Sequence, residues 1–262
     1  MTASQRKIIF TATFLLLFFL TSFGWAADIS DLVSKRVSQD GKTLDLSGLN
    51  IGASGAKQLA KMDLLAGITA LHLQGNNIRA RGMKALAKSP HLAGLKHIDL
   101  WGNLLGDLGL KAISESPYLK QLETLKLWKN EISDDSIELM VVSGNFTHLK
   151  ILMLNDNLIT PAGAAMLAST SLFPQLLTLN LFSNDIGDGG ALAFASSKNF
   201  SSLELLYLGE NKITDQGAVT LIESQYFPRL KVLDLAMNPL GEATMMAAFK
   251  VNNKGKLQIV YR

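Results

Sequence analysis

The chain has 262 residues with a formal net charge of +3, and apolar types make up 48% of it. This length and apolar content are enough for a large core, so the composition excludes a disordered tail. Cys is absent, which excludes disulfides, thiolate metal sites and a cysteine nucleophile. Arg6 and Lys7 are the only charged residues among the first 26, so the remainder is nearly neutral, and no nucleic-acid partner is predicted.

Residues 1–26 have the pattern of a signal peptide. The basic pair Arg6 and Lys7 precedes an apolar run over residues 8–23, and the small residues Gly24 and Ala26 follow. This pattern predicts cleavage after Ala26, export to the periplasm or the cell exterior, and no membrane insertion of the mature protein. The alternative is an uncleaved membrane anchor, but the sixteen residues of this run would span about 24 Å as a helix, less than a ~30 Å hydrocarbon core.

A repeat of 27 residues occupies the chain beyond the N-terminus. Its frame reads Leu-x-x-Leu/Ile-x-Leu-x-x-Asn-x-Ile/Leu, and its seven Asn positions are Asn76, Asn103, Asn130, Asn157, Asn184, Asn211 and Asn238. The Leu-x-Leu core alternates with period two, which predicts a strand with one buried face. The second half of each unit has apolar pairs at helical spacing, such as Leu110 with Ile113, and predicts a helix.

Seven in-phase copies of this frame resemble the leucine-rich repeat family, in the strand-plus-helix subfamily typified by ribonuclease inhibitor. The resemblance covers residues 42–262 and implies an α/β fold. It implies a curved horseshoe solenoid with a parallel concave sheet of about nine strands and helices on the convex side. It also implies a recognition surface for a protein partner and no enzymatic activity. The short repeat, the lack of cysteine-rich caps and the predicted signal peptide favour a bacterial, exported member.

Each repeat buries its face only against its neighbours, so the two ends of a solenoid need covering. Residues 27–41 are predicted to be an N-terminal capping segment, since Ile29, Leu32 and Val33 have helical spacing. At the other end the frame places Leu257 and Val260 inside and Tyr261 outside a final strand. No later element covers this strand, and an open edge predicts self-association.

Two further columns are predicted to be structural. The amides of the repeated Asn residues are expected to satisfy turn backbone groups. A column that lies just after each helix is expected to form a buried spine, and it reads Leu65, Leu92, Leu119, Phe146, Phe173, Phe200 and Phe227.

Side chains between the buried leucines point outward from the sheet, and large ones cluster there. We name five of them the aromatic patch: Trp101, Trp128, Met153, Phe182 and Tyr207. Exposed Trp and Tyr are typical anchors of protein interfaces, so the patch is predicted to bind a partner, with Asp99, Lys126 and Asp156 as a polar rim. The alternative is that the rings only stabilise the sheet by contacts between strands.

Asp45, His72 and Asp99 form a second outward row on adjacent strands. Two carboxylates beside an imidazole could serve a metal-dependent hydrolase. The ligand set is weak and no nucleophile stands in register, so we expect a polar rim with no metal and no cofactor.

The leading hypothesis is therefore a non-enzymatic protein-binding module, exported from a bacterium and directed at a host protein or another protein partner. The alternative is a passive envelope component or a self-assembling structural protein. A metal-dependent hydrolase is the third hypothesis.

Overall fold

The computed structural model describes residues 29–252, 255 and 257–262. The predicted signal peptide lies outside these residues. The chain divides into two compact units, the first ending at Lys35 and the second running from Arg36 to Arg262. In the first unit, helix α2 spans Ile29–Ser34, with Ile29 and Val33 buried. The capping role of this segment stays a prediction.

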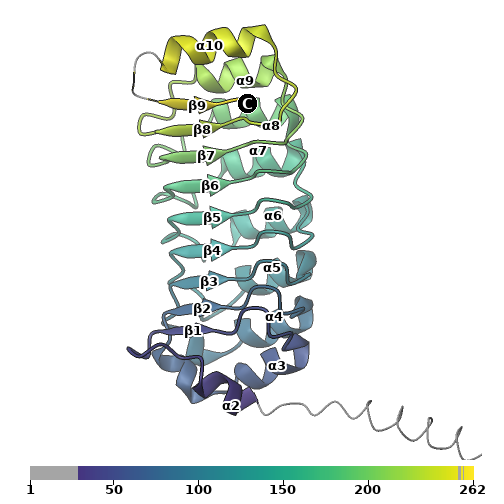
Figure 1. The fold of residues 1–262 in the computed structure, drawn as a ribbon, viewed down its shortest axis with the longest axis vertical. Coiled ribbons are helices and arrows are strands. Elements are labelled where there is room, and N and C mark those ends of the chain that lie inside the picture. Colours follow the sequence, from purple (N-terminus) through teal and green to yellow (C-terminus); the bar gives the residue numbers. More distant parts are fainter. Residues whose placement is uncertain (1–28, 253–254, 256) are drawn as a thin grey trace, which may run out of the picture. The chain divides into compact units, whose positions relative to one another are not determined.

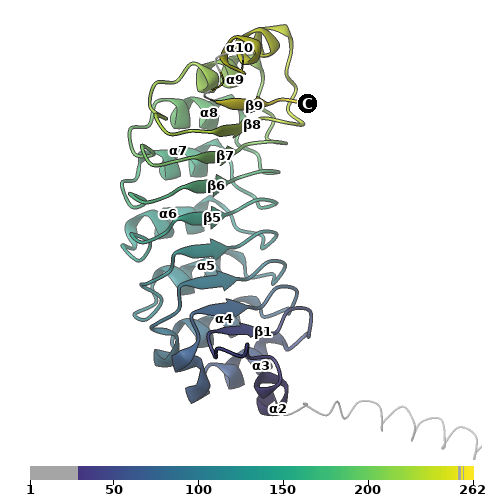
Figure 2. The same ribbon diagram turned by 60° about the vertical axis from the view of Figure 1, so that its left-hand side comes forward.

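The second unit contains one open sheet of nine parallel strands in chain order, with the repeat helices gathered on one side of it (Figure 1, Figure 2). The strands are β1 (Thr43–Asp45), β2 (Ala70–His72), β3 (His97–Asp99), β4 (Thr124–Lys126), β5 (Ile151–Met153), β6 (Thr178–Asn180), β7 (Leu205–Tyr207), β8 (Val232–Asp234) and β9 (Gln258–Val260). The helices are α3 (Gly52–Leu59), α4 (Arg79–Ala87), α5 (Gly106–Ser114), α6 (Asp134–Val142), α7 (Pro161–Ser169), α8 (Gly187–Ala195), α9 (Asp215–Ile222) and α10 (Glu242–Asn252), with short 3-10 helices at Asp63–Gly67 and Pro90–Leu92. The predicted α/β solenoid is confirmed.

The core lies between the sheet and the helices. The central residue of each strand is buried, for example Leu125 and Leu152 at 0% exposure. Neighbouring helices approach closely because each carries a small residue at the contact. A Cβ placed on Gly82 of α4 would lie 3.0 Å from the Cβ of Ala56 on α3, which leaves no room for a larger side chain there.

The repeated Asn residues satisfy backbone groups as predicted. Asn130 is fully buried. Its Nδ2 donates to the carbonyls of Leu100 at 2.9 Å and Trp128 at 3.0 Å. Its Oδ1 accepts from the amides of Asn103 at 3.1 Å and Leu105 at 3.3 Å. Since other members of the column bond in the same way, the Asn side chains form a continuous ladder that joins successive repeats.

The predicted spine after each helix is confirmed for most of its length. Its members from Leu65 to Phe200 are at most 2% exposed. Phe227, in the last repeat of the column, is half-buried.

The register of the last strand differs from the prediction. Leu233 of β8 pairs with Ile259, and Asp234 pairs with Val260. Ile259 is therefore the buried residue, at 4% exposure, and Val260 faces outward. This last repeat is one residue shorter than the others, and a slip of one residue moves every side chain of a strand to the opposite face.

Both edges of the sheet have hydrogen-bond partners. At β1, the amide of Asp45 donates to the carbonyl of Arg36 at 3.2 Å. At β9, the amide of Ile259 donates to Oδ1 of Asn252 at 2.7 Å, and its carbonyl accepts from Nδ2 of Asn252 at 3.3 Å. The expectation of an uncovered C-terminal edge was thus wrong for the central residue of β9. The cover is one side chain of the preceding helix, which no repeat pattern reveals.

Candidate functional site

The outward side chains of the strands form what we call the sheet face, on the side away from the helices. Trp101 and Trp128 lie just after β3 and β4 and stand next to each other there. Their rings stack with centroids 4.8 Å apart and an interplanar angle of 23°. They are 39% and 41% exposed. The sequence register therefore placed the two rings correctly, and the structure adds that they form one stacked, half-open surface.

The other members of the aromatic patch are less exposed. Met153, Phe182 and Tyr207 are all half-buried. Phe182 leans over its neighbour in the next repeat, because Gly209 has no side chain: a Cβ on Gly209 would lie 2.4 Å from Cε2 of Phe182. The patch thus consists of an open Trp pair and three flatter side chains on the following strands.

Asp99 and Lys126, predicted as rim residues, pair with each other. Nζ of Lys126 lies 3.3 Å from Oδ2 of Asp99. Oδ1 of Asp99 accepts from the amide of Trp101 at 3.2 Å, and Asp99 is only 9% exposed. Asp99 therefore contacts both the backbone of Trp101 and the side chain of Lys126. Of the ion pair, Lys126 is more accessible to solvent than Asp99.

Asp156, the third predicted rim residue, lies outside the strands in a turn with left-handed backbone. Its φ is 56°, and the equivalent positions of the first three repeats are glycines at 64–69°. The later repeats all carry other residues there, with φ between 53° and 59°: Lys129, Asp156, Ser183, Glu210 and Met237. A left-handed non-glycine residue costs about 1 to 2 kcal/mol. The five later repeats therefore carry a side chain at this edge of the sheet face although glycine would avoid the conformational cost.

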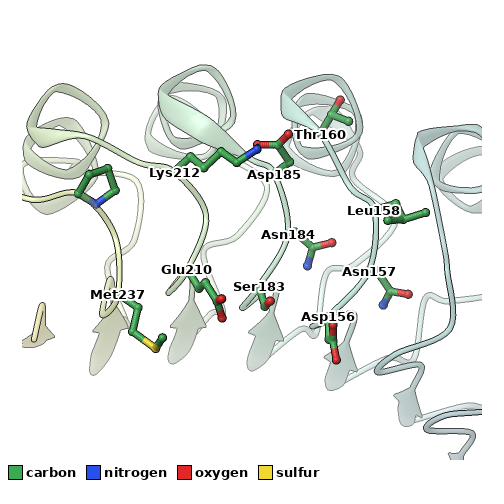
Figure 3. Close-up of a pocket in the computed structure, with 11 residues that line it drawn as sticks. Asp156, Asn157, Leu158, Thr160, Ser183, Asn184, Asp185, Glu210, Lys212 and Met237 are labelled. Atoms are coloured by element: carbon green, nitrogen blue, oxygen red, sulfur yellow. The ribbon is translucent and has the colours of Figure 1, made fainter.

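Four of these left-handed residues line an open groove of about 510 Å³. Figure 3 shows Asp156, Ser183, Glu210 and Met237 in a row at the ends of four consecutive strands, β5 to β8. Met237 is 68% exposed. Of this row, only Asp156 was predicted from the sequence. The signal that could have found the others is the loss of glycine from the turn column after the third repeat.

The Asp45, His72 and Asp99 row is in register across β1, β2 and β3. Hydrogen bonds from the Ser47 hydroxyl and amide hold the pKa of Asp45 below its usual range, and Asp99 is paired with Lys126. Within the part of the chain that the structure describes, no group of three or more His, Cys, Asp or Glu side chains could hold a metal ion.

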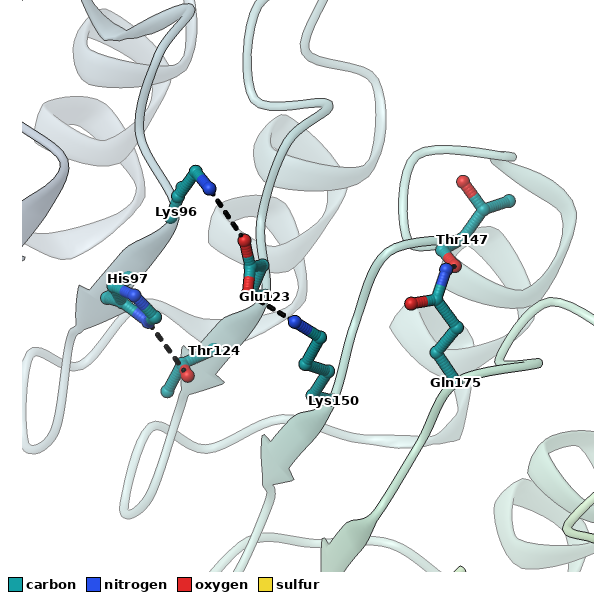
Figure 4. A network of polar contacts seen from close by, with 7 residues as sticks. All are labelled: Lys96, His97, Glu123, Thr124, Thr147, Lys150 and Gln175. Carbon is teal, nitrogen blue, oxygen red and sulfur yellow. Dashed lines mark hydrogen bonds and ion pairs between the residues drawn. The ribbon is translucent and has the colours of Figure 1, made fainter. Parts of the chain in front are cut away.

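A charged ladder runs beside the sheet face, at the residues just before β3, β4 and β5 (Figure 4). Glu123 lies between Lys96, at 2.9 Å, and Lys150, at 2.7 Å. The hydrogen bonds from Lys150 and Lys96 lower the pKa of Glu123 to about 2, so this carboxylate stays charged at neutral pH. In the next column the imidazole of His97 and the hydroxyl of Thr124 are 3.0 Å apart. His97 thus contacts a hydroxyl and not the carboxylate row.

Comparisons with known proteins agree with this architecture. A sequence profile described as a leucine-rich repeat matches residues 68–87, 147–168, 174–195 and 201–221. A search of curated proteins found no match.

Three solved structures are similar to this chain at low identity. One is a chain of an octameric complex of latrophilin 3, Unc5D and FLRT2, the last described as a leucine-rich repeat component; the TM-score is 0.39 with 21% identity over 67% of this chain and 55% of that chain. A protein from Bacteroides fragilis has a TM-score of 0.49 with 14% identity over 96% and 82%. An internalin from Listeria monocytogenes has a TM-score of 0.46 with 20% identity over 78% and 65%. The chain thus spans little more than half of the first of these.

The parallel sheet, the Asn ladder and the matched repeats together show a leucine-rich repeat fold. This fold is typical of protein-binding modules, which use the extended surface of the solenoid. Among the described residues, none of the helices is long and apolar enough to cross a membrane.

Proposed function

We propose that this chain is a non-enzymatic binding module that holds a protein partner on its sheet face. The observation that carries the proposal is the stacked, exposed pair Trp101 and Trp128. Burying a large apolar side chain is favourable by about 1.5 to 3 kcal/mol, so two open Trp rings in one place are costly without a partner. Trp is also the side chain most enriched among the residues that dominate interface energies.

The surroundings of the Trp pair support this proposal. The hydrogen bond that the Trp101 amide donates to Asp99 fixes the backbone beneath the first ring, and stacking restrains both rings. A rigid anchor loses little conformational entropy on binding. Lys126 and Asp156 are proposed to act as rim charges that govern orientation and association rate.

The test combines crosslinking with a double variant. A photo-crosslinking residue at position 128 should capture the partner from the native cell, whereas the same residue at position 192, on α8, should not. Leu192 is a matched control because it is apolar and 54% exposed on the helical side.

With the captured partner in hand, Trp101→Ala with Trp128→Ala should weaken its affinity by more than about 2 kcal/mol, about thirtyfold. The melting temperature should stay within a few degrees, because the pair adds only about 0.5 to 1.5 kcal/mol to stability. Leu192→Ala should change neither quantity. Unfolding of the double variant would make the rings structural, and an unchanged affinity would move the binding site elsewhere.

We also propose the finer assignment of a bacterial, exported protein of the ribonuclease-inhibitor-like subfamily, directed at a host protein. Eight-residue or longer α-helices after β1 to β8 support the subfamily. Arg6, Lys7 and the apolar run that follows them support export. Intact-mass measurement of protein from the native cell should give a chain that starts at Ala27, and a chain that retains residues 1–26 in the membrane fraction would contradict export by cleavage.

A further inference from the structure

A second cavity lies on the helical side, between α4 and α5, and none of its lining residues belongs to the sheet face. Its volume is about 340 Å³. It is open because the facing positions of the two helices carry small residues, among them Ala80, Ala87 and Ala112. Leu108 stands at its border, 70% exposed, and Pro117 lines one end. The floor of this helical groove is thus apolar.

The rim of the helical groove is basic. Arg81 and Lys84 of α4 line it together with Lys88, which caps the C-terminal end of that helix. Their spacing of three and seven residues puts them on one side of the helix. All three are exposed, and none has an ion-pair partner among the residues the structure describes. Across the groove, Lys111 pairs with Glu115 at 3.0 Å.

The charge of the groove is only partly balanced, because its lining has the cations Arg81, Lys84, Lys88 and Lys111 and the single carboxylate Glu115. Neither α3 nor α4 contains an acidic residue, and α3 adds Lys57 to the same side of the molecule. Although the net charge of the whole chain is small, the fold therefore concentrates positive charge around one apolar hollow. Composition alone could not show this concentration.

We propose that the helical groove is a second binding site, which takes an acidic segment of another protein. An apolar side chain of that segment would lie over Leu108 and the alanine floor, and its carboxylates would lie against Arg81, Lys84 and Lys88. A volume of 340 Å³ is at the lower end for ligand pockets and suits one or two side chains. Carboxylates bound to Arg and Lys make charge-assisted hydrogen bonds, which are about twice as strong as neutral ones.

Two other anionic partners fit the groove less well. A nucleic-acid backbone has phosphates for the rim but no apolar side chain for the floor. An anionic membrane surface would contact the rim and leave the hollow filled with water. The combination of unpaired cations and an apolar floor selects an acidic and apolar peptide.

The experiment uses a fluorescein-labelled peptide with two acidic residues on each side of a Leu-Phe pair, and measures anisotropy with the full mature chain. Arg81→Glu with Lys84→Glu should weaken binding about tenfold or more, since each lost contact involves a charged group. The control, Lys120→Glu with Lys129→Glu, changes the net charge equally at exposed positions outside the groove and should bind like the parent. Thermal unfolding verifies that each variant is folded.

A second comparison separates recognition from simple charge attraction. Replacing Leu and Phe of the peptide with Ser, or Leu108 of the protein with Ser, should also weaken binding several-fold. The proposal is overturned if the two double variants bind alike, or if the Ser peptide binds as well as the original. It is also overturned if polyuridine RNA or phosphatidylserine vesicles bind more tightly than the peptide and lose that binding in the groove variant. None of these outcomes bears on the Trp pair, so the two proposals succeed or fail separately.

Discussion

Replacing Asn130 with Ala should lower the free energy of unfolding by at least about 3 kcal/mol, because each buried polar group left without a partner costs about 1 to 3 kcal/mol. The substitution removes a side chain that bonds four backbone groups. Asn130 is fully buried, so water cannot replace these bonds without opening the turn. Chemical denaturation monitored by circular dichroism measures the effect.

The matched control for this prediction is Asn184→Ala in the same column. Asn184 makes the same kinds of bonds, to the amide of Ile159 and the carbonyl of Leu154, but it is only part-buried. Water can reach the freed groups there, so the loss should be clearly smaller than at Asn130. Equal losses would mean that the cost comes from the missing side-chain volume and not from unsatisfied backbone groups.

Leu127→Ala should cost about 2 to 5 kcal/mol, the range for truncating a fully buried leucine. Leu127 and Leu154 follow adjacent central strands, and both are completely buried. Each of these leucines packs between the repeats on either side of it. The surrounding structure therefore cannot easily relax into the cavity that the substitution to Ala leaves. Leu154→Ala should therefore have an effect of similar size.

Lys129→Ala provides the contrast within the same turn. Lys129 is exposed and left-handed, with φ at 55°. Ala is also unfavourable in that conformation, so the backbone cost is unchanged and the loss should stay under ~0.5 kcal/mol. A loss comparable to that of Leu127→Ala would show that the assigned register of inward and outward residues is wrong.

Repeat positions whose role depends on local pattern were predictable from the sequence. The 27-residue period and the Leu-x-Leu alternation indicated the strands, the buried leucines and the bonded Asn column, and the structure confirms them. The register also placed Trp101 beside Trp128. These features follow from periodicity because every repeat packs against a near copy of itself. Equivalent positions in successive repeats therefore have the same burial and the same hydrogen bonds.

Features that break the repeat were decided only by the tertiary structure. One missing residue reversed the faces of β9, and Asn252 bonded the strand edge that the sequence left open. The pairing of Asp99 with Lys126 depended on the conformations of two side chains from different repeats. The basic groove between α4 and α5 depends on how the side chains of two consecutive repeats face one another. The periodicity of a sequence indicates which face of a strand or helix a residue occupies. Contacts between side chains of different repeats depend on their distance in space, which only the folded structure sets.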